Sequence, residues 1–161
     1  MTTEDTIGLI NQLIETSKDG ELGYRTASQH VHNTQLKTVF SDYAEQRGHF
    51  AHQLQAEAER LGGTAAVSGS ITAALHRSWI DVKAAFSGGD GSAIVAACET
   101  GEDAAEAAYQ RVLDMDISGQ TRILIERQHR QVQEAHNHMR RLKASISTAE
   151  YPKTQTSEGK G

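Results

Sequence analysis

The sequence predicts an all-α protein, a four-helix bundle with one long helical crossover between its second and third long helices. Apolar residues recur at steps of three and four through four long segments, which is the period of an amphipathic helix. The chain has a single proline, Pro152, near its end, so no proline interrupts these segments. At 161 residues the chain is long enough for one domain with one core.

The first two predicted helices cover about residues 5 to 32 and 35 to 61, joined by a short turn at "HNTQ". The second helix is expected to end at Gly62 and Gly63, because glycine is common just beyond a helix C-terminus. The inward residues of the first helix are Ile7, Ile10, Leu13, Ile14, Tyr24, Ala27 and Val31, and those of the second are Leu36, Phe40, Tyr43, Phe50, Leu54 and Leu61.

The third and fourth long helices are predicted at about residues 91 to 114 and 118 to 147. The connection between the second and third is long and itself helical at about residues 70 to 87, with Trp79 on its apolar side. Two short connections and one long one are typical of a crossover bundle rather than of up-down-up-down wiring. The crossover helix covers either its own bundle or a partner subunit. The bundle is predicted at 1–149, and the polar segment 150–161 is expected to be disordered.

Composition limits the classes of function. The chain is 37% hydrophobic and 23% charged, no run of about 18 apolar residues could span a bilayer, and the start "MTTEDTIGLINQLIE" lacks a basic region, so we expect a cytoplasmic protein without a membrane segment. A net charge of −5 without a Lys/Arg-rich patch argues against binding to nucleic acid. Cys98 is the only cysteine, which excludes an internal disulfide and a Cys-rich zinc site.

Several polar residues fall on the apolar stripes. Glu21 and Glu102 lie within about 50° and 40° of the centres of their helices' apolar arcs, so both carboxylates should point inward. A buried carboxylate is costly unless a cation or hydrogen-bond donors meet it. Arg47 is closest to the arc centre of the second helix and could bridge both acids, and Gln128 lies on the arc of the fourth. We therefore predict a buried polar network of Glu21, Arg47, Glu102 and Gln128; the alternative for Arg47 is that its head reaches out to water.

A metal site is the competing interpretation of the same acids. Glu126 and His129 are three apart in "LIERQHRQVQEAHNHM", the spacing that carboxylate-bridged di-iron bundles use on two of their helices. With Glu21, Glu99 and Glu102 they would form a ligand set for iron or manganese. His129 lies about 90° from the arc centre, however, and the second helix supplies no ligand. The network is therefore favoured, and neither a cofactor nor a catalytic residue is expected.

Five stretches carry a resemblance to a known family: "IETSKDGELGYR", "YAEQRGHFAHQLQAEAERLGG", "SGSITAALHRSW", "CETGEDAAEAAY" and "IERQHRQVQEAH". Over about residues 5 to 145 the chain resembles a bacterial ferritin-like four-helix-bundle family of unknown function, within the ferritin and rubrerythrin-like clan. The resemblance implies a ferritin-like fold and a link to stress or stationary-phase physiology, without an established reaction.

The clan's second-helix pattern is F-x-x-x-A, then Glu-x-x-His, then A-x-x-L. The positions that align with it are Phe40, Ala44, Ala51 and Leu54. This alignment puts Arg47 at the clan's Glu and Phe50 at its His, which argues against a standard two-metal centre. Without such a centre, the expected role is that of a stress-associated structural or interaction protein. We also expect the chain to form a homo-oligomer, most simply a dimer. The alternative is a non-haem di-iron or manganese protein that reacts with oxygen or peroxide or binds iron.

Overall fold

The computed structural model describes residues 1–64 and 91–158, with side chains through residue 146. Four α-helices make up this part of the chain: α1 (Thr3–His30), α2 (Thr34–Arg60), α4 (Gly91–Leu113) and α5 (Gly119–Glu158). No strand occurs in these two ranges. The predicted all-α bundle is confirmed, while the predicted crossover helix with Trp79 lies outside the described residues.

The helix bounds follow the predicted ones except at the end of α5. This helix was expected to stop near residue 147 and instead continues to Glu158, so the predicted domain boundary at residue 149 falls inside it. The sequence contains no glycine between Gly119 and Gly159 that could end the helix. Polarity alone is therefore a poor indicator of where α5 ends.

The helix ends are closed by local hydrogen bonds. Thr2 and Asp5 form a reciprocal capping box at the start of α1, with distances of 3.0 and 3.1 Å. Asn33 accepts a hydrogen bond from the Leu36 N–H at 3.0 Å and caps α2. At the end of α2, Gly62 has a φ of +87°, and the Gly63 N–H donates to the Ala58 carbonyl at 2.9 Å. This left-handed turn explains why glycine occupies that position.

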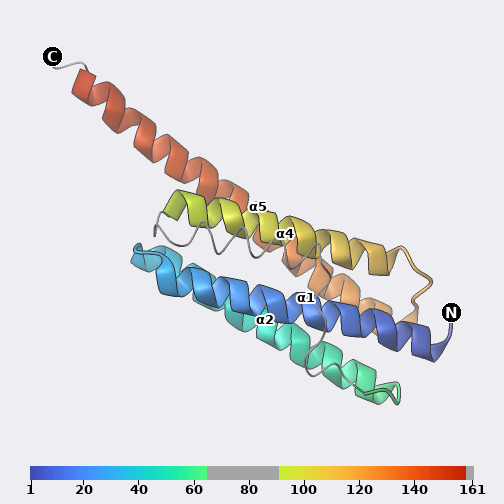
Figure 1. Cartoon of the computed structure of the whole chain (residues 1–161). Helices are drawn as coiled ribbons and strands as arrows, with labels where there is room; N and C mark the ends of the chain where they lie inside the picture. The colour runs from blue at the N-terminus through green and yellow to red at the C-terminus, as the bar shows by residue number, and fades with distance from the viewer. Residues whose placement is uncertain (65–90, 159–161) are drawn as a thin grey trace.

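The helices form two hairpins that pack side by side (Figure 1). Contacts are most extensive between α1 and α2 and between α4 and α5; α1 also packs on α4, whereas α2 and α5 touch less. The end of α2 and the start of α4 lie at opposite ends of the bundle, and α5 runs beyond the other three helices (Figure 1). None of the four described helices combines the length and apolar character that crossing a membrane requires.

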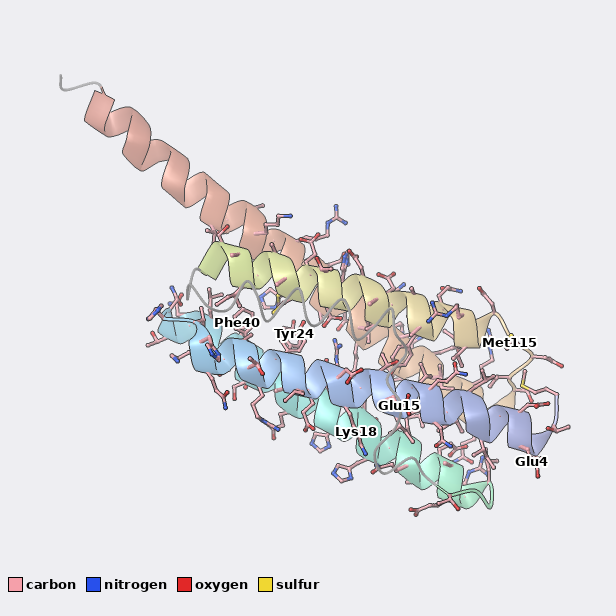
Figure 2. All side chains as sticks on the ribbon, viewed as in Figure 1. Glu4, Glu15, Lys18, Tyr24, Phe40 and Met115 are labelled. Carbon is pink, nitrogen blue, oxygen red and sulfur yellow. The ribbon has the colours of Figure 1, made fainter. Side chains whose placement is uncertain are left out.

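The core consists of two apolar clusters along the bundle axis. Figure 2 shows Tyr24 and Phe40 toward one end and Glu4 and Met115 at the other. The first cluster, nearer the start of α1, contains Ile10, Leu13, Ile14, Phe50, Leu54, Ala58, Ala105, Tyr109, Val112, Ile117, Ile125 and Val132. The second contains Tyr24, Ala27, Val31, Leu36, Phe40, Ala44, Ile94, Val95, Cys98 and Met139. The buried residues Arg47 and Glu102 lie on α2 and α4 between the stretches that form these two clusters.

Leu54→Ala is expected to lower the free energy of unfolding by about 2–5 kcal/mol, because Leu54 is fully buried in the first cluster and its removal leaves a cavity. Urea unfolding followed by circular dichroism measures the change. Leu22→Ala is the matched control, because Leu22 is mostly exposed on α1 and its loss should change stability by less than about 0.5 kcal/mol. Equal losses in both variants would contradict this assignment of the core.

Candidate functional site: a buried charge pair in the bundle interior

Arg47 lies in the interior of the bundle and does not reach solvent. Only 2% of its surface is exposed, and its face of α2 is shared with Phe40, Ala44 and Phe50. Its Nη2 donates to Glu102 Oε1 at 2.6 Å, and its Nε donates to Gln46 Oε1 at 3.3 Å. The guanidinium carbon also lies 5.6 Å from the centroid of the Phe50 ring, within range of a cation–π contact. Arg47 is therefore held by hydrogen bonds and by aromatic packing.

Glu102, on α4, is the acid that faces this guanidinium. Its exposed fraction is 1%, and its Oε1 accepts hydrogen bonds from both Arg47 and the Tyr24 hydroxyl. Its Oε2 is buried and has no hydrogen-bond partner among the described residues. Burial is the largest single influence and lowers the pKa of Arg47, but the charge and hydrogen bond of Glu102, together with Tyr24 and Tyr109, raise it by more, so the pKa lies above its ordinary value. The structure thus places a full positive charge against a carboxylate away from water.

Two residues that were not part of the predicted network complete the observed one. Gly20 lies opposite Arg47 on α1, and a Cβ added there would come within 3.2 Å of Arg47 Cγ. Tyr24 contributes its hydroxyl to Glu102 and its ring to Arg47, whose guanidinium carbon is 5.6 Å from the ring centroid. Burial, and then the nearby Glu102 charge, raise the pKa of Tyr24 well above its ordinary value, so the phenol is a neutral donor. Tyr24 was predicted only as a core residue, and Gly20 gives no periodic signal.

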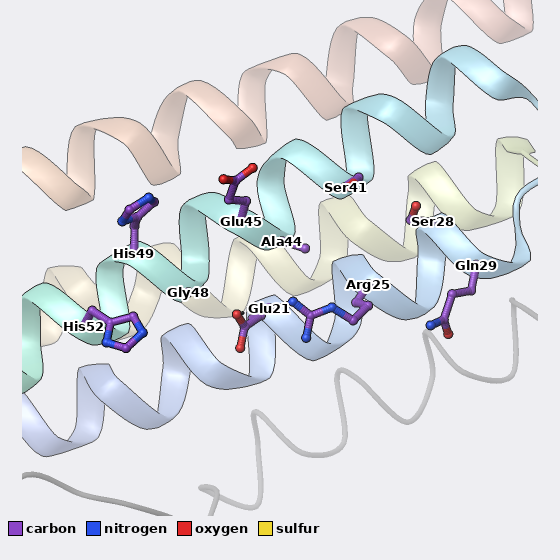
Figure 3. Close-up of a pocket in the computed structure, with 10 residues that line it drawn as sticks. All are labelled: Glu21, Arg25, Ser28, Gln29, Ser41, Ala44, Glu45, Gly48, His49 and His52. Carbon is purple, nitrogen blue, oxygen red and sulfur yellow. Dashed lines mark ion pairs between the residues drawn. The ribbon is translucent and has the colours of Figure 1, made fainter.

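Glu21 was predicted to point inward and join the network, and the structure places it outside. Its side chain is 31% exposed and forms an ion pair with Arg25, one turn further along α1, at 3.5 Å. It lies in a groove on the outer side of α1 and α2, beside Gly48 and His52 (Figure 3). The inward direction at this level of α1 is taken by Gly20, whose missing side chain admits Arg47. The structure therefore pairs Arg47 with Glu102 and leaves Glu21 outside.

Gln128 belongs to a second buried polar group. It accepts from the Tyr109 hydroxyl at 2.7 Å and donates from Nε2 to the Phe50 carbonyl at 3.3 Å and to Gln53 Oε1 at 3.0 Å. Burial raises the pKa of Tyr109 to about 12, so its hydroxyl stays protonated as a donor. The Ser17 hydroxyl lies 3.4 Å from that of Tyr109 and links α1 to the group. The amide of Gln128 thus joins α2, α4 and α5 by hydrogen bonds.

The remaining members of the alternative metal set are dispersed. Glu126 is 42% exposed and is paired with Arg122 of its own helix at 2.7 Å. Glu99 is 3.5 Å from Lys143. His129 is buried and stacks on Tyr109, with ring centroids 6.2 Å apart, and its Nε2 has no hydrogen-bond partner among the described residues. Within the part of the chain that the structure describes, no three His, Cys, Asp or Glu side chains converge so that they could hold a metal ion.

Two further titratable groups lie near the network. Burial raises the pKa of the Cys98 thiol, so this cysteine behaves as an unreactive core residue. Asp19, next to Gly20 on α1, is partly buried, and its Oδ2 has no hydrogen-bond partner among the described residues. Burial and then the charge of Glu15 raise the pKa of Asp19 to about 6. Neither residue supplies a hydrogen bond to Arg47 or Glu102.

Arg47→Ala is expected to lower the free energy of unfolding by about 3–5 kcal/mol, because it leaves the Glu102 charge buried without its partner. Arg25→Ala removes an exposed arginine from a weak ion pair and should cost less than about 1 kcal/mol. The double variant Arg47→Met/Glu102→Leu should be less destabilised than either single variant, since it removes both charges. Chemical unfolding of the wild type, the two alanine variants, the double variant and its two single variants, Arg47→Met and Glu102→Leu, measures these differences. Losses in the two single variants that add up to the loss in the double variant would contradict the pairing.

Asp19→Asn is expected to stabilise the protein at pH 7, because the neutral amide avoids the cost of a partly buried charge. Because the pKa of Asp19 is higher in the folded than in the unfolded protein, the protonated side chain favours folding. That stabilisation is complete below about pH 4 and is lost as the pH rises through 6. After allowance for solvent screening, the gain at pH 7 should be about 1 kcal/mol. Chemical unfolding of the wild type and Asp19→Asn at pH 4 and pH 7 measures the difference in their free energies of unfolding. This difference should be smaller at pH 4, and an equal difference at both pH values would disprove the assignment.

The chain is similar to one family of known proteins. A search of curated proteins finds no match to the chain. The family model described as "Domain of unknown function (DUF2383)" matches residues 5–115, a range that contains Gly20, Tyr24, Arg47 and Glu102 and ends before α5. Because this match covers more than half of the sequence, the chain belongs to the DUF2383 family.

Proposed function

We propose that this chain is a non-catalytic, ferritin-like bundle in which Arg47 and Glu102 occupy the place of an ancestral two-metal centre, and that it acts as a stress-associated structural or interaction protein. The observation that carries the proposal is the buried 2.6 Å pair between Arg47 and Glu102. A guanidinium does not lose its proton in a protein, so it supplies a permanent cation where a metal-binding bundle would recruit one from solution.

The side chains around the pair also support this view. The inward positions of α1 at this level are Ser17, Gly20 and Tyr24, and those of α2 are Arg47 and Phe50. None of these five is a carboxylate or an imidazole, the usual ligands of iron and manganese in helix bundles. A metal ion entering here would have to displace the guanidinium and would find one inward carboxylate, Glu102.

A structural role accounts for the burial of the network. Arg47, Glu102 and Tyr24 are almost fully enclosed, and their contacts connect α1, α2 and α4. Catalysis would need groups that a substrate can reach, whereas these groups satisfy one another inside the bundle. Their arrangement favours a role in fixing how the helices align, and a homodimer that presents the outer faces of the bundle fits this role.

The second candidate, an iron or manganese protein, is favoured by a different observation. Glu102 Oε2 and His129 Nε2 are both buried and have no hydrogen-bond partner within the described residues. Buried ligating atoms of this kind call for an explanation, and a bound cation is one. The candidate requires Glu126 and Glu21 to leave their exposed positions and turn inward.

Metal analysis separates the two candidates. Protein purified without chelators from cells supplemented with iron or with manganese should contain well below one equivalent of either metal per chain, because Arg47 already neutralises Glu102. Inductively coupled plasma mass spectrometry measures the content, and Glu102→Gln is the matched variant. A content near two equivalents that disappears in Glu102→Gln would overturn the proposal and establish an interior metal centre.

A further inference from the structure

A groove of about 790 Å³ lies at the end of the bundle where α1 begins and α4 ends. Residues from the start of α1 line one side of it, and residues 114–116, in the turn that joins α4 to α5, line the other. Figure 2 shows Glu4 and Met115 at this end. The apolar surface of the groove comes from Met1, Leu9 and Met115, and the two methionines are each 48% exposed. Methionine adapts its shape to what it contacts, so this surface suits an apolar side chain of a partner.

The turn holds Met115 in its exposed position. Ile117, two residues further on, is buried in the first apolar cluster. Arg122 of α5 donates from Nη1 to the carbonyls of Leu113 and Ile117 at 3.2 and 3.3 Å, and the Met115 N–H donates to the Val112 carbonyl at 3.1 Å. The backbone on both sides of Met115 is therefore fixed. A partner would meet a preorganised apolar side chain, which lowers the entropic cost of binding.

Gly8 lies in the lining of the same groove and has no packing role within the described residues. A Cβ added there would meet no atom within 4 Å, and its φ is not in the left-handed region. At Gly20, Gly48 and Gly63, by contrast, an added Cβ would come within 3.2 Å of a neighbouring side chain. Glycine inside a helix is less favourable than alanine. The missing side chain at Gly8 therefore points to the close approach of another molecule to α1.

The charge around the groove indicates what that molecule carries. Four carboxylates line the groove, and the amino group of Met1 is the one positive group among its described lining residues. The carboxylates belong to Glu4, Asp5, Asp114 and Asp116. An occupant must therefore bring positive charge of its own. The chain itself has a net charge of −5, so electrostatics disfavour a second copy as the occupant.

We propose that this groove binds a basic peptide segment of another protein, in which a large apolar side chain is flanked by lysine or arginine. The apolar side chain would lie over Gly8 between Leu9 and Met115, and the flanking cations would face the carboxylates of the rim. This surface gives a partner class to the interaction role proposed above and rests on that role. Metal content tests that role without involving the groove, so either can fail alone.

Fluorescence anisotropy of the full chain with a labelled peptide, Lys-Lys-Leu-Leu-Lys-Lys-Leu-Leu-Lys-Lys, measures binding. We expect saturable binding, and Met115→Ser should weaken the affinity at least about tenfold because it removes the exposed apolar side chain. Leu22→Ser is the matched control, since Leu22 is 57% exposed but lies outside the groove, and its affinity should stay within about twofold of the wild type. No saturable binding, or equal affinity for a peptide with serine in place of leucine, would overturn the proposal.

Substitution of Gly8 separates binding from folding. Alanine and tryptophan both fit the open space at this position and favour a helix more than glycine does, so neither variant should have a lower Tm than the wild type. The added side chain nevertheless occupies the path of the peptide. Gly8→Ala should weaken the affinity at least about threefold, and Gly8→Trp at least about tenfold. A Gly8→Trp variant that binds the peptide as tightly as the wild type would contradict the site.

Charge reversal tests the rim and the identity of the occupant. Asp116→Lys should weaken peptide binding at least about fivefold, whereas Glu45→Lys, the same change of net charge on α2 outside the groove, should have less than about a twofold effect. Equal losses in the two variants would show attraction to the net charge alone and overturn the proposal. Light scattering of the wild type and Met115→Ser follows the oligomeric state. A dimer that Met115→Ser converts to a monomer would assign the groove to a second copy and overturn it as well.

Discussion

The pairing of Arg47 with Glu102 is the interaction on which the interior of this bundle depends. Either charge alone would be destabilising inside a helix bundle, because the lost hydration of a single ion exceeds what apolar packing returns. Their opposite charges offset each other, the Tyr24 hydroxyl donates a hydrogen bond to Glu102, and the rings of Tyr24 and Phe50 lie within cation–π range of the guanidinium. Three helices must therefore be correctly aligned before the pair can form.

The position of the pair explains the division of the core. Apolar contacts tolerate sliding of one helix along another, because one leucine can replace the next in a similar pocket. A hydrogen-bonded charge pair does not tolerate such sliding, since shifting one helix by a single turn, about 5.4 Å, would separate the donor from the acceptor. The polar layer between the two apolar clusters is in this view the element that sets the register of α2 against α4.

Much of this architecture follows from periodicity, and the rest depends on how helices meet. The three- and four-residue spacing was sufficient to locate the helices and to assign Arg47, Glu102 and Gln128 to inward faces, where their side chains are buried. Glu21 differs from these three residues because it lies at the margin of the apolar face of α1. Whether a side chain at that margin is buried depends on the neighbouring helix rather than on the sequence of α1. The space beside Gly20 that Arg47 occupies forms only when α1 and α2 pack against each other. The end of α5 was also missed, because a polar sequence does not by itself end a helix.

The two glycines at the contact of α1 and α2 have a joint consequence. Gly20 admits Arg47 from one side and Gly48 admits Glu21 from the other, and each glycine is the immediate chain neighbour of the other pair's charged residue. A single interhelical separation thus serves the inner and the outer face at once. A change in that separation would therefore disturb the contact of Arg47 with Gly20 and the space that Glu21 takes beside Gly48 together.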